Sequence, residues 1–430
     1  MNTEIAQIIR EAGGRVPFAR FMELALTHPR EGYYARAQRI LGRRGDFSTA
    51  PLLSPEFNEA VATLVEELVR AALQAQAESG EGANSETDSG LALGAERLAV
   101  VELGGGEGHL AQAILGSWQK NLTYLRDKLS YSVVEVGEGL REKQREKLNS
   151  FMQKGWDIRW GNTLTQACEG LSPVVILGNE FLDALPVHVV QVSGSQAQEA
   201  WVALEETENG FVWQWDELSP SAVVEIQSLW GALDTLDTGQ AQKPQSLQAM
   251  QKLNSTQSMQ ASQASNVTQA LQTLQALQAT QALGKDGILE LRPVVADLLA
   301  EIEALMPSGS LLFIDYGAWG PGRGRTVRGY FHHQRIDDPL ARPGHQDLTA
   351  DVDFAALDMH GRDLGFETIV FTNLAAFMAT GLKQAECGLS WDAGGSCSDF
   401  LENDKRATVL RALLDENDLG GEFKVILQVR

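Results

Sequence analysis

The segment from Val100 to Leu110 constrains the fold of this chain more than any other. It reads Val-Val-Glu-Leu-Gly-Gly-Gly-Glu-Gly-His-Leu, with an apolar run before the glycines and an alanine-rich amphipathic stretch after them. This pattern predicts a buried strand, a glycine turn and then a helix. Because glycine has no Cβ, the turn lets a ligand approach bare backbone close to the helix N-terminus.

The spacing of the glycines indicates which ligand suits the turn. The motif is Glu-x-Gly-x-Gly-x-Gly, and its acid is Glu102. Its glycines are Gly104, Gly106 and Gly108. Dinucleotide-binding turns instead have the spacing Gly-x-Gly-x-x-Gly. An acid before the glycines favours a cationic ligand, and S-adenosylmethionine carries both an ammonium and a sulfonium group. The alternative is a tight structural turn without a ligand.

Composition excludes several classes of protein. The 430 residues can bury a large core, as one elaborated domain or two. The net charge of −22 argues against general nucleic-acid binding, which needs a basic surface. The first residues lack the pattern of a signal or transit peptide, and no run is long and apolar enough to insert into a membrane. The three cysteines lie far apart without metal-ligand spacing, so they are expected to be structural.

The order of elements predicts an α/β fold with a doubly wound parallel sheet. Strands alternate with helical patterns from residue 97 onward. The expected strands span 97–103, 130–136, 157–160, 174–177, 309–317, 367–372 and 424–429. The last strand closes a hairpin and is expected to be antiparallel. This order resembles the Rossmann-like core of class I methyltransferases.

We expect the chain to divide into an N-terminal helical and loop extension, residues 1–95, and a core, residues 96–430. Within the core, three alternating runs predict an antiparallel addition over 187–216. A largely helical, low-complexity insertion is expected over 217–306, where tolerated expansion is preferred to a partner-binding tract. Residues 322–353 are expected to form a long irregular loop, which in a compact domain is often functional.

Polar residues at the ends of the second and third strands are candidates for binding an adenosyl group. Glu135 ends the expected second strand, where a carboxylate can accept both ribose hydroxyls. Its alternative is an ordinary charged strand end. Asn162 follows the third strand and can hydrogen-bond adenine, although Gly161-Asn162 also makes a good turn.

The segment from Asn179 to Pro186 supplies a pair of acids after the fourth strand. Glu180 and Asp183 lie three residues apart, so on a turn or helix start they face the same side. Such a pair can bind a guanidinium as a fork and position its nitrogen, and a buried acid can help to remove the proton. The alternative is a helix start that Asn179 caps and both acids favour. Asn179 is also a candidate cofactor ligand.

Several polar residues on later loops form a weaker group. They are Asp315, Tyr316, His332, His333, His345 and Asp347. The adjacent histidines point apart in an extended chain, and no carboxylate–histidine spacing supports a metal site. Loop packing or hydrogen bonding to a substrate is the expected role of this group.

A set of motifs spread over both ends of the core points to a known family. The matching segments are Phe18–Glu23, His28–Tyr34, Gly45–Pro51, Ser54–Phe57, Glu102–Gly108, Asn179–Pro186, Ile314–Gly317, Arg328–Tyr330 and Gly344–Ala350. Together they resemble the MidA/NDUFAF-type family of S-adenosylmethionine-dependent methyltransferases. The loop 78–93 and the Gln-rich insertion lie outside the resemblance.

The resemblance implies a bacterial or mitochondrial protein methyltransferase with S-adenosylmethionine as its cofactor. The eukaryotic members of that family methylate an arginine of a respiratory complex I subunit and help to assemble the complex. By that analogy Gly104, Gly106 and Glu135 bind the cofactor, and the segment with Asp46 and Phe47 closes over it. The paired acids then face the target guanidinium. The leading compartment is the cytoplasm of a bacterial-type protein, and the alternative is the mitochondrial matrix for a processed eukaryotic form.

The expected partner is therefore a protein that presents an arginine, without nucleic-acid binding or membrane insertion. Three alternatives stay open at this point. The substrate can be a small molecule, or the chain can be a non-catalytic assembly factor that binds S-adenosylmethionine for stability. A dinucleotide-dependent oxidoreductase is the most distant alternative, because the glycine spacing differs from that of its fingerprint.

Overall fold

The computed structural model describes residues 3–35, 54–79, 97–193, 196–205, 210–238, 287–320, 324–384 and 408–430. The chain forms two compact units, each assembled from several segments. Unit 1 comprises Met1–Ala35, Asp183–Ala300 and Ala318–Phe366, and unit 2 comprises Arg36–Leu182, Glu301–Gly317 and Glu367–Arg430. The boundary expected at residue 95 stays a prediction.

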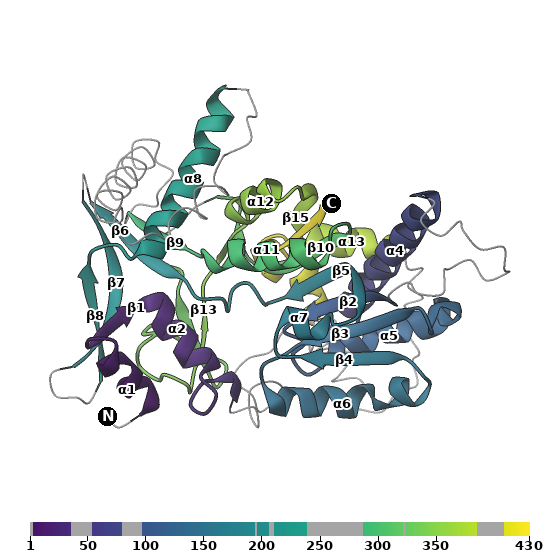
Figure 1. Cartoon of the computed structure of the whole chain (residues 1–430), viewed down its shortest axis with the longest axis horizontal. Coiled ribbons are helices and arrows are strands. Elements are labelled where there is room, and N and C mark those ends of the chain that lie inside the picture. The colour runs from purple at the N-terminus through teal and green to yellow at the C-terminus, as the bar shows by residue number, and fades with distance from the viewer. Residues whose placement is uncertain are drawn as a thin grey trace. The chain divides into compact units, whose positions relative to one another are not determined.

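Unit 2 is built on a twisted sheet with the strand order β15-β16-β10-β5-β2-β3-β4 (Figure 1). These strands are β2 (Arg97–Leu103), β3 (Leu129–Val134), β4 (Asp157–Gly161), β5 (Leu171–Asn179), β10 (Ser310–Ala318), β15 (Glu367–Asn373) and β16 (Phe423–Val429). Neighbouring strands from β10 to β4 run parallel, whereas β16 is antiparallel to both β10 and β15. The predicted doubly wound sheet with an antiparallel last strand is confirmed.

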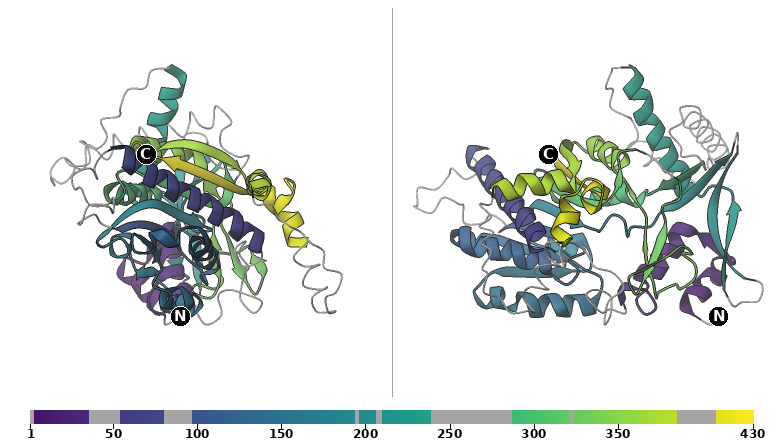
Figure 2. Two further views of the ribbon diagram at one scale, coloured as in Figure 1. Left: turned by 90° about the vertical axis from the view of Figure 1, so that its right-hand side faces the viewer. Right: turned by 180° about the vertical axis from the view of Figure 1, so that it is seen from behind.

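Helices cover this sheet because their apolar faces need burial. α4 (Pro55–Ser79) lies beside α5 (His109–Asn121) (Figure 2). Side chains of both helices enter the main apolar core. The Oγ of Ser54 accepts a hydrogen bond of 3.1 Å from the Phe57 amide and so caps the start of α4. α6 (Glu138–Gln153) follows β3, and α13 (Leu374–Gln384) follows β15. The α5 start places the glycine turn at the carboxyl edge of β2.

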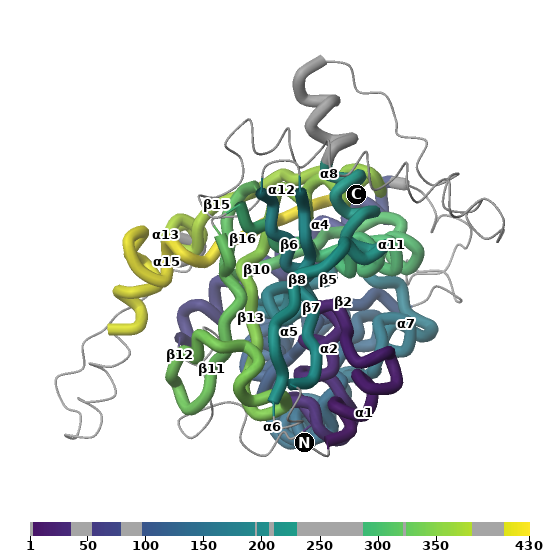
Figure 3. Tube along the Cα trace, turned by 90° about the vertical axis from the view of Figure 1, so that its left-hand side faces the viewer, coloured from purple at the N-terminus to yellow at the C-terminus, as the bar shows by residue number. Residues whose placement is uncertain are grey.

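Unit 1 contains the predicted antiparallel strands. They are β6 (His188–Ser193), β7 (Gln196–Leu204) and β8 (Phe211–Asp216), and β1 (Arg15–Pro17) and β9 (Ile288–Leu291) extend the sheet. Figure 3 shows β6, β7 and β8 running side by side. The helices of this unit include α1 (Glu4–Glu11), α2 (Phe18–Thr27), α8 (Pro220–Thr238) and α12 (Phe354–Asp363). α11 (Val294–Leu305) begins in unit 1.

The expectation of an irregular loop over 322–353 is wrong for much of its length. β11 (Arg328–Phe331), β12 (Gln334–Ile336) and β13 (Asp347–Thr349) form a three-stranded antiparallel sheet. A two-residue turn joins β11 to β12, and its residues His332 and His333 have φ of 48° and 60°. Positive φ at both turn residues matches the twist of a hairpin but is usually supplied by Asn and Gly. The histidine pair therefore concealed the turn, and these residues are not in an extended chain.

Some predictions fall outside the described residues. These are Asp46 and Phe47, residues 80–93 of the loop expected over 78–93, Cys387, Cys397 and residues 239–286 of the insertion expected over 217–306. Residues 78 and 79 of the expected loop belong to α4. No helix within the described ranges combines the length and apolar character that a membrane crossing requires.

Candidate functional site

The glycine turn of unit 2 adopts a conformation that only glycine tolerates well. Gly104, Gly106 and Gly108 have φ of 68°, 51° and 79°, all in the left-handed region. A Cβ on the intervening Gly105 would lie 2.8 Å from Val133 Cγ1 and 3.1 Å from Gln144 Nε2. The turn is therefore pressed against the sheet, and bare backbone forms its floor.

Gln144 of α6 holds this turn, and we did not single it out from the sequence. Its side chain is fully buried. Its Nε2 donates to the Gly106 carbonyl at 2.8 Å, and its Oε1 accepts from the Trp160 indole at 2.8 Å. Leu140, Leu148 and Phe151 are buried on the same helix. A glutamine on such a helical apolar stripe is the signal by which the sequence could have revealed this buried polar role.

Glu102 lies buried beneath the turn. Its Oε2 accepts a 2.8 Å hydrogen bond from the Tyr131 hydroxyl. Burial raises the pKa of Glu102 to about 7, the Tyr131 hydrogen bond opposes that shift, and the charge of Glu135 adds to it. A buried carboxyl group with a raised pKa gains an opposite charge as its partner when a cationic ligand binds beside it.

Glu135 lies one residue beyond β3, at the carboxyl edge where the sequence placed it. Its Oε1 accepts from the Gly137 amide at 2.9 Å. Burial raises the pKa of Glu135 to about 7, while the hydrogen bonds from Gly137 and Gln144 lower it. Glu102 and Glu135 thus come from neighbouring strands and share one edge of the sheet.

The two asparagines differ in their surroundings. Asn162 is exposed after β4, and its backbone N–H donates to Gln166 Oε1 at 2.9 Å. Asn179 ends β5, and its Nδ2 donates to Glu180 Oε1 at 3.3 Å. Its buried Oδ1 has no hydrogen-bond partner among the described residues. An unsatisfied buried acceptor at a strand end fits a ligand that donates hydrogen bonds.

Glu180 stands in strained backbone after β5. Its φ is 48°, a left-handed value that costs a non-glycine residue about 1–3 kcal/mol. Its amide donates to the Ile314 carbonyl at 2.9 Å. The Asp315 Oδ2 accepts from the amides of Phe181 and Leu182 at 3.1 and 2.8 Å. Asp315 therefore holds the turn after β5 in place by hydrogen bonds to its backbone, which agrees with the loop-packing role expected for this residue.

The helix-start alternative for this segment is wrong, because residues 180–187 form a turn that no helix follows before β6. Asp183 belongs to unit 1, whereas Glu180 belongs to unit 2. Within unit 1 the Asp183 carboxyl is buried. Burial raises the pKa of Asp183 to about 6, and the positive charges of Arg292 and Arg328 oppose that shift.

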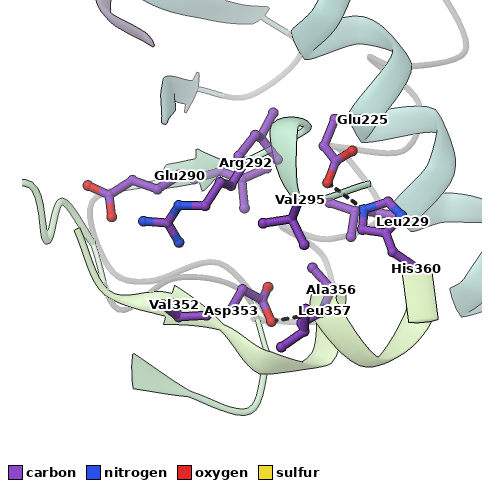
Figure 4. A pocket seen from close by; sticks show the side chains of 12 residues that line it. Glu225, Leu229, Glu290, Arg292, Val295, Val352, Asp353, Ala356, Leu357 and His360 are labelled. Carbon is purple, nitrogen blue, oxygen red and sulfur yellow. Dashed lines mark hydrogen bonds and ion pairs between the residues drawn. The ribbon is translucent and has the colours of Figure 1, made fainter. Parts of the chain in front are cut away.

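Arg292 ties the Asp183 segment to the end of β13. Its guanidinium donates to the carbonyls of Leu185, Ala350 and Asp351 at 3.2, 2.9 and 3.3 Å. Figure 4 shows Arg292 beside Glu290 in a small pocket of unit 1. In the same pocket His360 of α12 contacts Glu225 of α8 at 2.9 Å, a buried link between two helices. The pocket therefore combines apolar walls with charged groups that already have partners.

The residues of unit 2 fit S-adenosylmethionine. The turn offers bare backbone, Glu102 and Glu135 offer buried carboxylates, and Asn179 offers an unsatisfied acceptor. A ligand with an ammonium, a sulfonium and ribose hydroxyls satisfies these groups better than a pyrophosphate. Within the described residues no group of three or more His, Cys, Asp or Glu side chains has a metal-binding arrangement.

Comparisons with known proteins agree with this fit. Residues 88–372 match the family described as "Putative S-adenosyl-L-methionine-dependent methyltransferase". The chain is 25% identical over 380 residues to the protein arginine methyltransferase NDUFAF7 homolog, mitochondrial, of Caenorhabditis elegans, which covers 81% of this chain and 69% of that protein. It is 28% identical over 363 residues to the protein arginine methyltransferase NDUFAF7, mitochondrial, of Danio rerio, with 80% and 68% covered.

The fold also resembles a solved structure. A Burkholderia thailandensis protein bound to S-adenosyl-homocysteine superposes with a TM-score of 0.65 at 24% identity. The superposition covers 99% of this chain and 90% of that protein. At this identity the likeness shows the shared fold.

Proposed function

Because the chain belongs to this family of S-adenosyl-L-methionine-dependent methyltransferases, we propose that it methylates an arginine side chain of a protein. The main support for S-adenosylmethionine as the cofactor is the shared edge of β2 and β3, where two buried carboxylates lie beside the glycine turn. The arginine half is supported by the paired acids after β5 and by the names of the relatives.

In this proposal the ligands of the cofactor are residues of unit 2. The turn from Gly104 to Gly108 lies against the amino-acid part, with Glu102 as the acid beneath it. Glu135 accepts the ribose hydroxyls. The further ligands are Asn162, Asn179, Asp46 and Phe47, of which the last two lie outside the described residues. When bound, S-adenosylmethionine supplies an electrophilic methyl group on its sulfonium.

The acceptor residues are Glu180 and Asp183. A guanidinium presents five N–H donors in a fixed fork, which a carboxylate pair matches better than any single acceptor. The acceptor nitrogen must lose a proton at or after transfer. Because the pKa of Asp183 is raised to about 6, this carboxyl can take up that proton more readily than an ordinary exposed aspartate.

Labelled S-adenosylmethionine and a cell extract test the proposal. We expect label in protein, released by acid hydrolysis as methylated arginine. Glu180→Gln and Asp183→Asn should each reduce this labelling about 100-fold, the scale of a lost acid–base group. The matched control is Glu142→Gln, an exposed acid of α6, which should keep the wild-type rate.

Other outcomes would contradict the proposal. Label found only in lipids or small molecules would refute a protein acceptor. Cofactor binding without any transfer by the wild-type protein would favour the non-catalytic assembly factor. A complex I subunit as target stays a prediction from the family resemblance. The mitochondrial names of the relatives favour the matrix over the bacterial-type cytoplasm as the compartment.

A further inference from the structure

One face of β13 in unit 1 carries polar side chains that the function above does not use. Asp347 and Thr349 are two residues apart on this strand, so their side chains point to the same face. In the neighbouring strand β11, Tyr330 pairs with Asp347 and Arg328 pairs with Thr349. Cross-strand partners share a face, so four polar side chains gather there.

The two β13 side chains are buried. Asp347 is 2% exposed and Thr349 is 6% exposed. The Oγ1 of Thr349 has no hydrogen-bond partner within the part of the chain that the structure describes. Burying a hydroxyl without a partner destabilises the folded protein, so a ligand that bonds the Thr349 hydroxyl would relieve that cost.

Tyr34 and Asp183 complete the cluster. The Tyr34 hydroxyl donates to Asp347 Oδ1 at 3.0 Å. Burial and the nearby carboxylates of Asp347 and Asp183 raise the pKa of Tyr34 well above its ordinary value. The Ala350 amide, directly after β13, donates to the Asp183 carbonyl at 3.0 Å. Asp183 therefore lies beside the end of the strand that carries Asp347 and Thr349.

The charges of this cluster favour a cation. Arg328 forms an ion pair with Asp351 at 2.7 Å, and it also donates to the Tyr330 hydroxyl at 3.0 Å. Arg292 is engaged by the backbone carbonyls described above. Asp183, Asp347 and Asp351 outnumber Arg292 and Arg328, and the buried Glu290 and Asp353 also lie near Arg292. Because its acids outnumber its cations, the cluster suits a guanidinium better than an anion.

We propose that Tyr34, Asp183, Asp347 and Thr349 form the binding site for the guanidinium of the methyl acceptor. Asp347 and Asp183 accept its N–H groups, and Thr349 Oγ1 accepts one more hydrogen bond. Tyr34 is a positioning residue, because it orients the Asp347 carboxylate. This inference rests on the proposed arginine specificity, and it adds Asp347 and Thr349 to the acceptor residues that the sequence indicated.

The test uses the full chain saturated with S-adenosylhomocysteine, so that no methyl transfer occurs. The probes are N-acetyl-arginine amide and N-acetyl-citrulline amide, which has nearly the same shape without the charge. We expect the arginine probe to bind at least about tenfold more tightly, which corresponds to about 1.4 kcal/mol. Asp347→Asn should weaken arginine binding and leave citrulline binding unchanged, because it removes only a charge. Thr349→Val should also weaken arginine binding. Tyr34→Phe should weaken it less, because the carboxylate remains.

The controls separate this inference from the proposed function. Asp337→Asn, a surface acid of the same unit, should bind both probes like the wild type. Thr349→Val exchanges the hydroxyl for a methyl group of similar size, so it keeps the test informative if Asp347→Asn fails to fold. Wild-type arginine binding by Asp347→Asn and Thr349→Val would overturn the acceptor site, whereas equal binding of the two probes by the wild-type protein would contradict the proposed arginine specificity. Failure to bind S-adenosylhomocysteine would instead contradict the cofactor assignment in unit 2.

Discussion

Replacement of Gln144 by leucine tests whether the glycine turn depends on a side chain from α6. Leucine has a similar volume, so the change removes hydrogen bonds without opening a large cavity. Two bonds of 2.8 Å are lost, one to the Gly106 carbonyl and one from the Trp160 indole, together with a longer bond of 3.4 Å to Glu135. Each of the two short bonds is worth about 1 kcal/mol net, so the free energy of unfolding should fall by at least about 2 kcal/mol.

The cofactor should also bind less tightly to this variant. Without the Gln144 amide the Gly106 carbonyl can rotate, and the pKa of Glu135 loses one of the hydrogen bonds that lower it. We expect the Kd for S-adenosylhomocysteine to rise about tenfold, equivalent to about 1.4 kcal/mol. Denaturant unfolding and calorimetric titration measure the two effects separately.

A matched control lies on the same helix. Gln153 is exposed at the end of α6, so Gln153→Leu should change stability by no more than about 0.5 kcal/mol. Gln144→Leu with the unfolding midpoint and the Kd of the wild type would refute the reasoning, because the turn would then hold its shape without this side chain.

Three further predictions use the same site. Gly105→Ala places a Cβ 2.8 Å from Val133 Cγ1 and should lower the free energy of unfolding by about 1–3 kcal/mol. Gly116→Ala on α5 places a Cβ with no atom within 4 Å and should not destabilise the protein, so equal unfolding midpoints of the two variants would contradict the close packing of Gly105. Because the folded pKa values of Glu102 and Glu135 are raised from 4.5 to about 7, the ligand-free protein should lose stability as the pH rises from 4.5 through 7, while the affinity for S-adenosylmethionine should rise over the same range. A titration series that shows a flat affinity across pH 7 would argue against these carboxylates as ligands of the cofactor. Arg292→Gln leaves the buried carbonyls of residues 185, 350 and 351 without their donor, so the free energy of unfolding should fall by about 2–4 kcal/mol. Arg335→Gln, at an exposed arginine, should change it little, and an Arg292→Gln variant that unfolds at the wild-type temperature would disprove this role of Arg292.

The local signals of this sequence were sufficient for the core. The glycine motif and the apolar runs predicted β2, the turn and α5, because glycine and hydrophobic periodicity act over a few residues. The position of Glu135 at a strand end followed from the same local pattern. The His332-His333 turn was missed because its residues are uncommon at positive φ, so the usual composition of a hairpin turn was absent.

The sequence by itself determined the α/β order, the cofactor class that the acid-led glycine turn favours, and the acids that follow β5. Only the tertiary structure decided that Gln144 reaches from α6 to the turn, that Asp315 bonds the amides after Glu180, and that Asp347 meets Tyr34 across 313 residues of chain. The physical reason is the separation along the chain over which each kind of interaction acts. Periodicity and turn chemistry depend on adjacent residues, whereas a hydrogen bond between distant segments exists only after packing has brought buried donors and acceptors together.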